Sequence, residues 1–482
     1  MIFNSLIFLA FFLIFFGLYW FLLNKKTTIQ NLLILIGSYV FYGWSDWRFL
    51  SLLVGVSALN FYLGIQISKA TNERARKIYL NIGLIQGVAG LAYFKYFNFF
   101  ITSFKQTFAT LGVDLNIHTL NIIVPLGISF FTFRTISYLL DVEKGKIDAC
   151  TNSLVFFNYV SFFPSLLSGP IDKAKLLIPQ LEKQRVFNYD LAADGMRQIL
   201  WGLFKKVVIA NNCATITNEI FNNYTNLPAS SLLIGAFYYA IQIYADFSGY
   251  SDMAIGIAKL LGFTITKNFD YPFFAQNIAD FWRKWHMSLT SWLTEYVFTP
   301  LSIKFRDYDK LGLILAIVIN FTICGIWHGA NWTYVLFGFL HGCYFIPLII
   351  NGTMNKKKVI KTDRMLPTLS ELFNIAMTFG VVMLTFIIFR AESITKAFDY
   401  IRLLFSTSLF KMPVVDLISV AICQLFVTFM FLTEWMHRDK QHGLELSAML
   451  NAKKRWALYT FILFSLLFFG LFSDNQFIYF QF

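Results

Sequence analysis

Two histidines lie in or beside strongly apolar stretches of the chain, where an ionisable side chain is costly to bury. His328 occurs in GIWHGANWTYVLFGFLHG (residues 325–342), inside the run 311–355, which has no charged side chain. Desolvation lowers the pKa of a histidine and keeps the imidazole neutral, so that it can accept a proton from a hydroxyl group. The sequence therefore predicts a buried general base at His328. The alternative is an imidazole hydrogen-bonded across packed helices, and for His341 this packing role is the expectation.

The second histidine, His286, follows a pair of cations in FWRKWHMSLTSWL (residues 281–293). At ~100° per residue, aromatic and leucine side chains fill one arc of a helical wheel, and Arg283, Lys284 and hydroxyl residues fill the other. His286 falls at the border of the apolar arc. The pattern predicts one amphipathic helix at a membrane surface. Such a helix could be only an interfacial anchor, or it could hold His286 at the edge of a buried site.

Two carboxylates, Asp246 and Asp252, lie inside the apolar segment QIYADFSGYSDMAIGIAKLLGF (residues 242–263). A helix with this row of acidic and hydroxyl side chains is too polar to face lipid. The row lines a cavity, forms a helix-packing network, or does both, and the sequence favours neither reading over the other. Arg134, in the apolar segment 125–142, is the candidate cation for these carboxylates.

Motifs for other chemistries are absent from the sequence. There is no GxSxG elbow, P-loop or HExxH motif, and no serine or cysteine has a neighbouring base that would activate it. The spacing of His328 and His341 does not suit a helical metal site, and the five cysteines contain no CxxC pair. We therefore expect no metal site and no disulfide framework, with the cysteines as small buried hydrophobic residues.

The composition indicates that membrane helices must position these residues. The 482 residues are 57% hydrophobic and 14% charged, whereas soluble domains have about 25% charged residues. Residues 1–24 also carry no charge, and we expect them to form a first transmembrane helix rather than a signal peptide. We predict an all-α polytopic membrane protein with about 11–13 transmembrane helices plus interfacial or re-entrant helices, since one span needs ~20 apolar residues. A single domain over residues 1–482 is expected.

The net charge is +13, but its distribution argues against nucleic acid as a partner. Basic residues gather in short loops between apolar runs, at 25–26, 68–77, 356–358 and 438–455. This is the positive-inside bias of membrane proteins, which predicts that these loops are cytoplasmic. No internal repeat stands out, which weakens the alternative of a transporter built from inverted halves.

Taken together, these segments resemble the membrane-bound O-acyltransferase (MBOAT) family, in particular its bacterial alginate O-acetylation (AlgI-like) branch. The resemblance is carried by QIYADFSGYSDMAIG, FWRKWHMSLTSWLTEYVFTPL and GIWHGANWTYVLFGFLHG, and further by PLGISFFTFRTISYLLDV, SFFPSLLSGPI, FIIFRAESITKAFDYI and FIYFQF. It covers nearly the whole chain, and the motifs are specific in combination. It implies a ring of transmembrane helices in which a cytoplasmic entrance and an extracytoplasmic funnel meet near the catalytic histidine.

The resemblance implies that His328, in the WHG motif, is catalytic, and that His286, in the FWRxWH motif, is the second histidine of the site. It implies an acetyltransferase of the bacterial inner membrane with no bound cofactor and with cytoplasmic acetyl-coenzyme A as the acyl donor. The acetyl group would pass outward to a polysaccharide acceptor, such as an alginate-like exopolysaccharide or peptidoglycan. A separate extracytoplasmic protein of the SGNH/GDSL-like type would be the partner.

Five polar residues are candidates for binding the donor or the substrate. Arg283 and Lys284 would meet the phosphates of coenzyme A, since both side chains are suitable phosphate partners. The other candidates are Asp246, Asp252 and Asn331. Two alternatives stay open: D-alanyl transfer to teichoic acid (DltB-like), with a carrier protein as donor, and a transporter that moves a polymer or an acyl carrier without chemistry.

Overall fold

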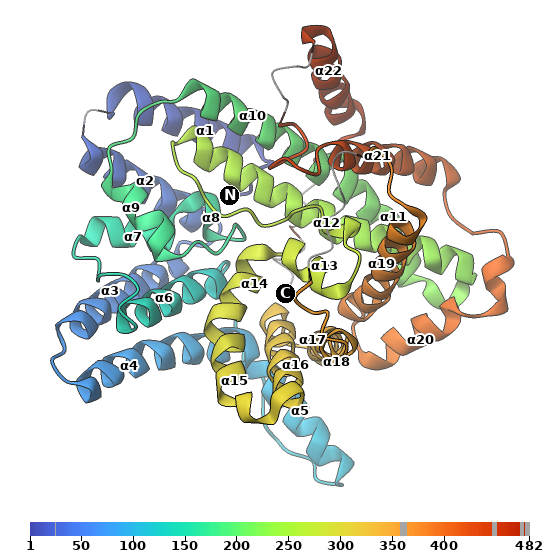
Figure 1. The fold of residues 1–482 in the computed structure, drawn as a ribbon, viewed down its shortest axis with the longest axis horizontal. Coiled ribbons are helices and arrows are strands. Elements are labelled where there is room, and N and C mark those ends of the chain that lie inside the picture. The colour runs from blue at the N-terminus through green and yellow to red at the C-terminus, as the bar shows by residue number, and fades with distance from the viewer. Residues whose placement is uncertain (25, 357–363, 446–450, 473–476, 478–482) are drawn as a thin grey trace. The chain divides into compact units, whose positions relative to one another are not determined.

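The computed structural model describes residues 1–24, 26–356, 364–445, 451–472 and 477, and these residues form helices without a strand. Figure 1 shows the order of the helices along the chain. The chain divides into two compact units: Met1–Ala192 with Ile257–Thr266, and Ala193–Gly256 with Lys267–Phe482. The all-α class expected from the composition is confirmed, whereas the single domain over residues 1–482 stays a prediction.

The first unit contains nine helices that lie wholly within its described residues. They are α1 (Leu6–Gly17), α2 (Thr27–Gly43), α3 (Arg48–Lys69), α4 (Glu73–Leu91), α5 (Phe97–Thr110), α6 (Ile128–Glu143), α7 (Ser153–Ser161), α8 (Phe163–Leu166) and α9 (Ala174–Glu182). Helices α3, α4 and α6 contact one another and lie side by side in Figure 1. Arg134 lies on α6 and is fully buried.

The counterion of Arg134 is Asp172, which belongs to the same unit. Its Nη2 lies 3.8 Å from a carboxylate oxygen of Asp172 and donates to the Ser165 carbonyl at 2.9 Å and the Pro170 carbonyl at 3.2 Å. These carbonyls are available because the chain is not regularly helical around the breaker Ser168-Gly169-Pro170. The predicted pairing of Arg134 with the carboxylates of segment 242–263 is therefore wrong.

The second unit contains the remaining helices. They are α11 (Asn211–Asn222), α13 (Ile278–Lys284), α14 (Met287–Leu293), α15 (Thr299–Lys304), α16 (Asp309–His328), α17 (Trp332–Cys343), α18 (Ile346–Ile350), α19 (Leu369–Arg390), α20 (Ile394–Leu404), α21 (Leu417–Met436) and α22 (Ala452–Phe469). Helices α10 (Tyr189–Leu203) and α12 (Ala229–Leu260) cross the boundary between the units. A π-helical segment, Phe204–Ala210, joins α10 to α11.

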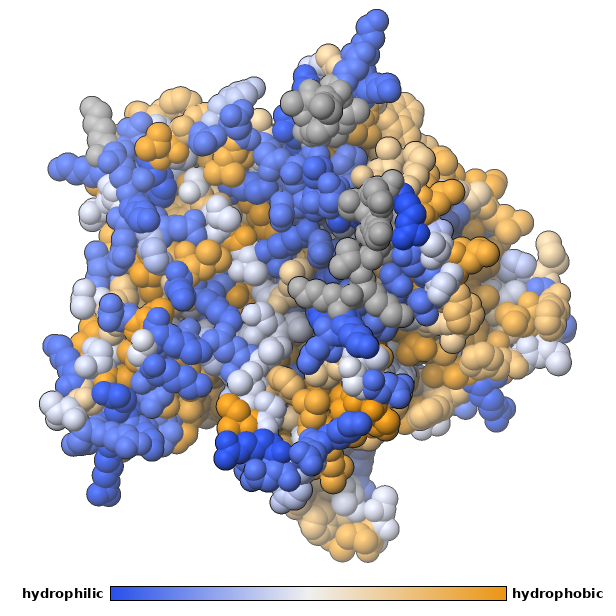
Figure 2. Space-filling view, viewed as in Figure 1, coloured by the Kyte–Doolittle hydropathy of each residue, from blue (hydrophilic) through white to orange (hydrophobic). Residues whose placement is uncertain are grey.

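Six described helices are long and apolar enough to cross a membrane: Arg48–Lys69, Tyr189–Asn222, Arg306–His328, Trp332–Ile350, Leu369–Arg390 and Leu417–Met436. Their outer faces are apolar; on α21, for example, Ile418 is 73% and Leu425 62% exposed, and Figure 2 shows apolar surface over this flank. Soluble proteins rarely expose such surfaces, so lipid covers them. Six is fewer than the number of spans expected, because other apolar runs form shorter or interrupted helices, as at Phe162 between α7 and α8.

Helices α16 and α17 pack closely because glycines face each other at their crossing. A Cβ atom on Gly338 would lie 2.2 Å from the carbonyl oxygen of Phe321 and 2.9 Å from the Cα atom of Gly325. Small residues let the backbones of membrane helices approach to this distance. The crossing therefore fixes the second half of α16, which ends at His328.

Gly338→Ala is expected to destabilise the protein, because the new methyl group would meet backbone atoms of α16 rather than a flexible side chain. Overpacking of this kind costs about 1–3 kcal/mol of unfolding free energy. Gly380→Ala on α19 is the matched control, since a Cβ atom there meets no atom within 4 Å. Thermal unfolding of both variants in detergent measures the difference, and equal melting temperatures would contradict the close crossing.

Candidate active site

The chain reverses sharply at His286, between α13 and α14. His286 has a left-handed backbone (φ 43°), which is uncommon for a residue other than glycine. The Met287 N–H donates to the Asn268 carbonyl at 2.8 Å, and the Ser288 hydroxyl donates to the side-chain oxygen of Asn268 at 2.9 Å. The prediction of one continuous amphipathic helix over 281–293 is therefore wrong, because hydrogen bonds to Asn268 stabilise a turn that local periodicity does not indicate.

Asn268 also orients the imidazole of His286. Both side chains are fully buried, and Nδ1 of His286 lies 3.0 Å from Oδ1 of Asn268. The same atom of the Asn268 amide accepts a hydrogen bond from the Ser288 backbone N–H at 3.3 Å. A backbone N–H can only donate, so the accepting atom is the amide oxygen and not the amide nitrogen. Nδ1 therefore carries the proton, and the lone pair of the neutral ring lies on Nε2.

The two predicted catalytic histidines come together around the indole of Trp327. The ring centroid of Trp327 lies 5.7 Å from that of His286 and 5.0 Å from that of His328. His328 is the last residue of α16 and is only 4% exposed. Its Nε2 lies 3.9 Å from Sγ of Cys324, one turn earlier. The structure thus forms a desolvated pair of imidazoles in the second unit, and a neutral imidazole there can act as a base.

His341 has a structural role beside this pair. The Trp282 indole donates to its Nδ1 at 3.1 Å, and the Thr385 hydroxyl lies 3.3 Å from its Nε2. Both ring nitrogens therefore have partners, as expected for a packing residue. The ring of Phe337 separates it from His328, at centroid distances of 4.4 Å and 6.0 Å.

The cations of the FWRK stretch lie at the end of α13. Nη2 of Arg283 donates to the Met354 carbonyl at 2.6 Å, and Nζ of Lys284 lies 3.4 Å from a carboxylate oxygen of Asp280. Both side chains are partly exposed. Met354 lies two residues before Lys356, the first residue of the basic segment 356–358. Residues 357 and 358 lie outside the described residues. Through its contact with Met354, Arg283 therefore lies on the side that the positive-inside bias assigns to the cytoplasm.

The carboxylates of α12 pair with two neighbouring lysines of the π-helical segment. Nζ of Lys205 lies 2.7 Å from Asp252, and Nζ of Lys206 lies 2.5 Å from Asp246. All four side chains are mostly buried. In this structure the row therefore forms an ion-paired packing network, and Asp252 also lines a small cavity. Whether either carboxylate contacts substrate stays a prediction.

Sequence reasoning missed Lys205 and Lys206, because they lie within a mainly apolar segment, residues 195–215. Two charged residues in the middle of such a run were the available signal, since an intramembrane cation is expensive without a partner. Lys205 also donates to the Ser248 hydroxyl at 3.0 Å and lies 3.9 Å from Glu434, which in turn accepts from the Tyr244 hydroxyl. Glu434 sits near the end of α21.

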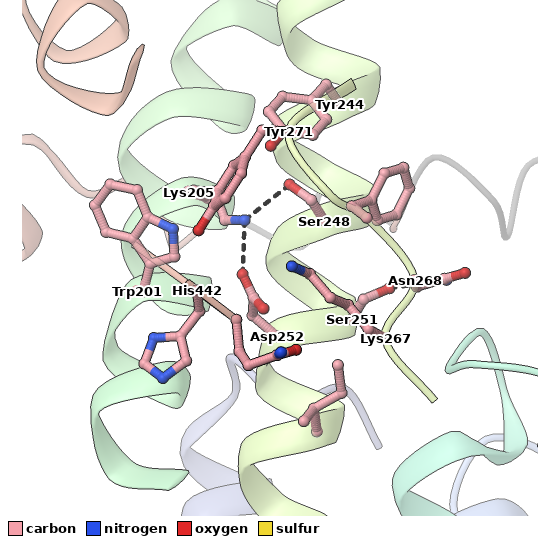
Figure 3. Close-up of a pocket in the computed structure, with 13 residues that line it drawn as sticks. Trp201, Lys205, Tyr244, Ser248, Ser251, Asp252, Lys267, Asn268, Tyr271 and His442 are labelled. Atoms are coloured by element: carbon pink, nitrogen blue, oxygen red, sulfur yellow. Dashed lines mark hydrogen bonds and ion pairs between the residues drawn. The ribbon is translucent and has the colours of Figure 1, made fainter. Parts of the chain in front are cut away.

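A small polar cavity, here called the lysine cavity, adjoins this network (Figure 3). Lys205, Ser248 and Asp252 line it together with Asn268, whose amide donates to the Ser251 hydroxyl at 3.1 Å. Its volume is about 10 Å³, which leaves room for about one water molecule. Asn268 therefore lines the lysine cavity and also contacts the imidazole of His286.

Asn331 holds the turn that follows the WHG motif. Its side-chain oxygen accepts from the Thr333 N–H at 3.1 Å and caps α17, and its amide donates to the Glu392 carbonyl at 2.9 Å. These contacts position the turn, and a direct contact of Asn331 with substrate stays a prediction. In the described part of the chain, no group of three or more histidine, cysteine or acidic residues could hold a metal ion.

Acid is expected to destabilise the protein through His286, which lies outside the six candidate spans. Burial lowers its pKa well below the usual 6.5, and electrostatic interaction with the neighbouring imidazole of His328 lowers it further. Below pH 6.5 the unfolded chain therefore binds a proton at His286 that the folded chain does not bind. The contribution of His286 to the free energy of unfolding is fully present above pH 6.5. It is lost as the pH falls below 6.5, by up to about 1.4 kcal/mol per pH unit.

Melting temperatures in detergent between about pH 7.5 and 5.5 test this. His286→Gln, which keeps hydrogen-bonding capacity, should show a smaller fall than the wild type. An equal fall in both proteins would place the acid sensitivity elsewhere.

The chain is similar in sequence to known membrane acyltransferases. A profile of the MBOAT, membrane-bound O-acyltransferase family, matches residues 146–389. The probable alginate O-acetylase AlgI of Pseudomonas aeruginosa is 36% identical over 84% of this chain and 75% of its own length. The peptidoglycan O-acetyltransferase of Helicobacter pylori is 32% identical over 78% and 74%, respectively. The teichoic acid D-alanyltransferase of Streptococcus thermophilus is 31% identical over 55% and 68%.

Proposed function

Because the chain belongs to the membrane-bound O-acyltransferase family and is itself a multi-pass membrane O-acyltransferase, we propose that it transfers acetyl groups for the modification of a cell-envelope or extracellular polysaccharide. Relatives named for acetyl transfer to alginate or peptidoglycan match 84% and 78% of the chain, whereas a D-alanyltransferase matches 55%. The observation that carries the proposal is the buried histidine pair around Trp327, the site where a hydroxyl group would be activated.

In the proposed reaction, His328 is the general base. Its neutral imidazole takes the proton of an acceptor hydroxyl as the oxygen attacks the carbonyl carbon of an acetyl thioester. The tetrahedral intermediate then collapses, the carbon–sulfur bond breaks, and the imidazolium returns the proton to the leaving thiolate. Atoms and protons balance, and no redox partner is needed. His286, held by Asn268, would position the donor or take part in proton transfer.

The arrangement of the second unit supports a donor from the cytoplasm. Nζ of Lys310, near the start of α16, donates to the Ile350 carbonyl at 2.9 Å, so this end of α16 lies beside the basic segment that follows α18. His328 lies at the other end of a helix roughly 30 Å long, close to the hydrocarbon thickness of a bilayer. In this proposal acetyl-coenzyme A enters from the basic side, near Arg283, and the acceptor approaches from the side of His328.

The proposal includes a bacterial inner-membrane location and an extracytoplasmic SGNH/GDSL-like partner. Such a partner would accept the acetyl group on a serine hydroxyl and pass it to the polysaccharide. The hydroxyl activated by His328 then belongs either to the polymer or to the partner, and the chemistry at the imidazole is the same in both cases.

Proteoliposomes that contain the purified protein test the proposal. Acetyl-coenzyme A labelled in the acetyl group is supplied on one face, and alginate oligosaccharide or peptidoglycan fragments, with and without the purified partner, on the other. Covalent label on the acceptor or the partner supports the proposal. In a parallel assay, a carrier protein charged with labelled D-alanine is the donor. Label on the acceptor from this donor alone would mean that the reaction is D-alanyl transfer. Movement of the acceptor across the membrane without any label would mean that the protein is a transporter.

A further inference from the structure

A second, larger cavity lies in the second unit where α19 ends and α20 begins, and is here called the arginine cavity. Its volume is about 550 Å³, within the usual range for small-ligand sites. Arg390, Glu392 and Lys396 line it on one side, and the C-terminal end of α11 with Tyr224 lines it on the other. It is lined by different residues from those of the lysine cavity.

Arg390 is a cation without a carboxylate partner in the described part of the chain. Its one hydrogen bond runs from Nη2 to the side-chain oxygen of Asn218 at 2.6 Å, and its guanidinium carbon lies 5.0 Å from the ring centroid of Phe221. Lys396, by contrast, forms an ion pair with Glu392. The charges that line the cavity therefore sum to one positive charge, contributed by a guanidinium with free donor capacity.

The arginine cavity is next to the proposed catalytic base. Phe389, which precedes Arg390, has its ring centroid 5.2 Å from that of His328. The turn after His328 is tied to the cavity wall by the hydrogen bond from Asn331 to the Glu392 carbonyl at 2.9 Å. The cavity thus lies at the end of α16 from which the acceptor is proposed to approach.

We propose that the arginine cavity binds one carboxylated sugar unit of the acceptor, with its carboxylate on Arg390. A guanidinium pairs with a carboxylate through two parallel hydrogen bonds, and a single excess positive charge matches one carboxylate per unit. The amide of Asn222 and the carboxylate of Glu392 can bond sugar hydroxyls, and the rings of Phe221 and Tyr224 offer apolar surface. The inference rests on the proposed function, because it assigns the substrate class of the same site.

An acidic protein segment fits this cavity less well. Such a segment presents several carboxylates, whereas Lys396 is already neutralised by Glu392 and one cation is left. The mixture of aromatic, amide and carboxylate groups also suits a ligand rich in hydroxyl groups better than one rich in charge.

Binding measured by calorimetry tests the proposal on the full-length protein in detergent, without an acetyl donor. The probes are a uronic-acid trisaccharide and its carboxyl-reduced, neutral counterpart. We expect the acidic trisaccharide to bind at least about 10-fold more tightly, and Arg390→Gln to abolish this preference. Arg390→Lys, which keeps the charge but loses the paired donors, should retain part of it. Arg402→Gln, an exposed position on α20 outside the cavity, is the control.

Glu392→Gln is expected to change binding in the direction opposite to Arg390→Gln. The Glu392 side chain is 80% exposed, so its replacement should not affect folding. Removal of the like charge and release of Lys396 should tighten binding of the acidic trisaccharide by about two- to fivefold. Equal binding of the two trisaccharides to the wild type, or an unchanged preference in Arg390→Gln, would overturn the proposal. So would tighter binding of a penta-glutamate peptide that is lost in Arg390→Gln, since this would indicate a protein partner.

These outcomes are separable from those of the acetyl-transfer assay. If the wild type prefers the acidic trisaccharide in an Arg390-dependent manner but transfers no acetyl group, the binding site stands and the proposed function fails. If acetyl transfer occurs without any preference between the two trisaccharides, the proposed function stands and the carboxylate site fails.

Discussion

His328→Ala is expected to lower acetyl transfer by about 10²–10⁴-fold while the protein remains folded. The imidazole is 4% exposed at the end of α16, and the side chains that contact it directly are aromatic rings and a thiol, which do not act as bases at neutral pH. His328→Gln should be equally impaired, because an amide accepts a hydrogen bond but does not take up a proton. The measurement is label transfer in proteoliposomes, with protein amount and melting temperature determined in parallel.

Two other histidines make this prediction specific. His118→Ala, at an exposed position in the first unit, should leave transfer unchanged. His286→Gln should give a smaller loss than His328→Ala if it positions the donor, and this loss should be seen more in KM than in kcat. Transfer by His328→Ala at near wild-type rates would mean that the base lies elsewhere, and an equal loss of kcat in both variants would assign proton transfer to the pair.

The membrane class and the burial of His286 and His328 could be predicted from the sequence because their signals are local. A run without charge, 311–355, is sufficient to indicate membrane helices, and an imidazole at 328 inside it is costly unless it has a use. The contact of both imidazoles with the ring of Trp327 could not be predicted from local sequence. Their approach depends on the glycine contact between α16 and α17 and on the turn at His286, and both are tertiary features.

The turn at His286 shows why helical periodicity failed locally. The helical wheel of 281–293 is amphipathic, and the stretch has no glycine or proline to indicate a break. The left-handed residue is held by Asn268, eighteen positions earlier, which has no neighbouring motif. A long-range hydrogen-bonding partner of this kind leaves no trace in the local pattern, although the local pattern did identify the buried aromatic residues Trp282 and Trp285.

The cation that pairs with the carboxylates of α12 was predicted wrongly for the same reason. Arg134 was the visible charge in an apolar run, but ion pairing follows distance in the fold rather than prominence in the sequence. Arg134 pairs with Asp172, while Lys205 and Lys206 pair with Asp252 and Asp246.

Lys205→Met is expected to destabilise the protein by about 3–5 kcal/mol, because it removes the cation from a buried network and leaves its carboxylates uncompensated. Lys205 lies 2.7 Å from Asp252 and 3.9 Å from Glu434, and the two carboxylates are 13% and 1% exposed. Methionine matches the shape of the lysine stem, so that the loss reports charge rather than packing. Unfolding in mixed detergent micelles measures it, with Lys144→Met, at an exposed lysine without an ion pair among the described residues, as the control.

A second substitution distinguishes lost charge compensation from misfolding. In Lys205→Met/Glu434→Gln, one of the two uncompensated carboxylates becomes neutral, and the amide can still bond the Tyr244 hydroxyl. The double variant should therefore be more stable than Lys205→Met, with a coupling of about 0.5–3 kcal/mol between the two positions. Additive losses, or a Lys205→Met protein as stable as Lys144→Met, would show that the carboxylates are not held ionised by Lys205. In that case, interactions other than the ion pairs around the lysine cavity would stabilise the packing of α12 against the π-helical segment.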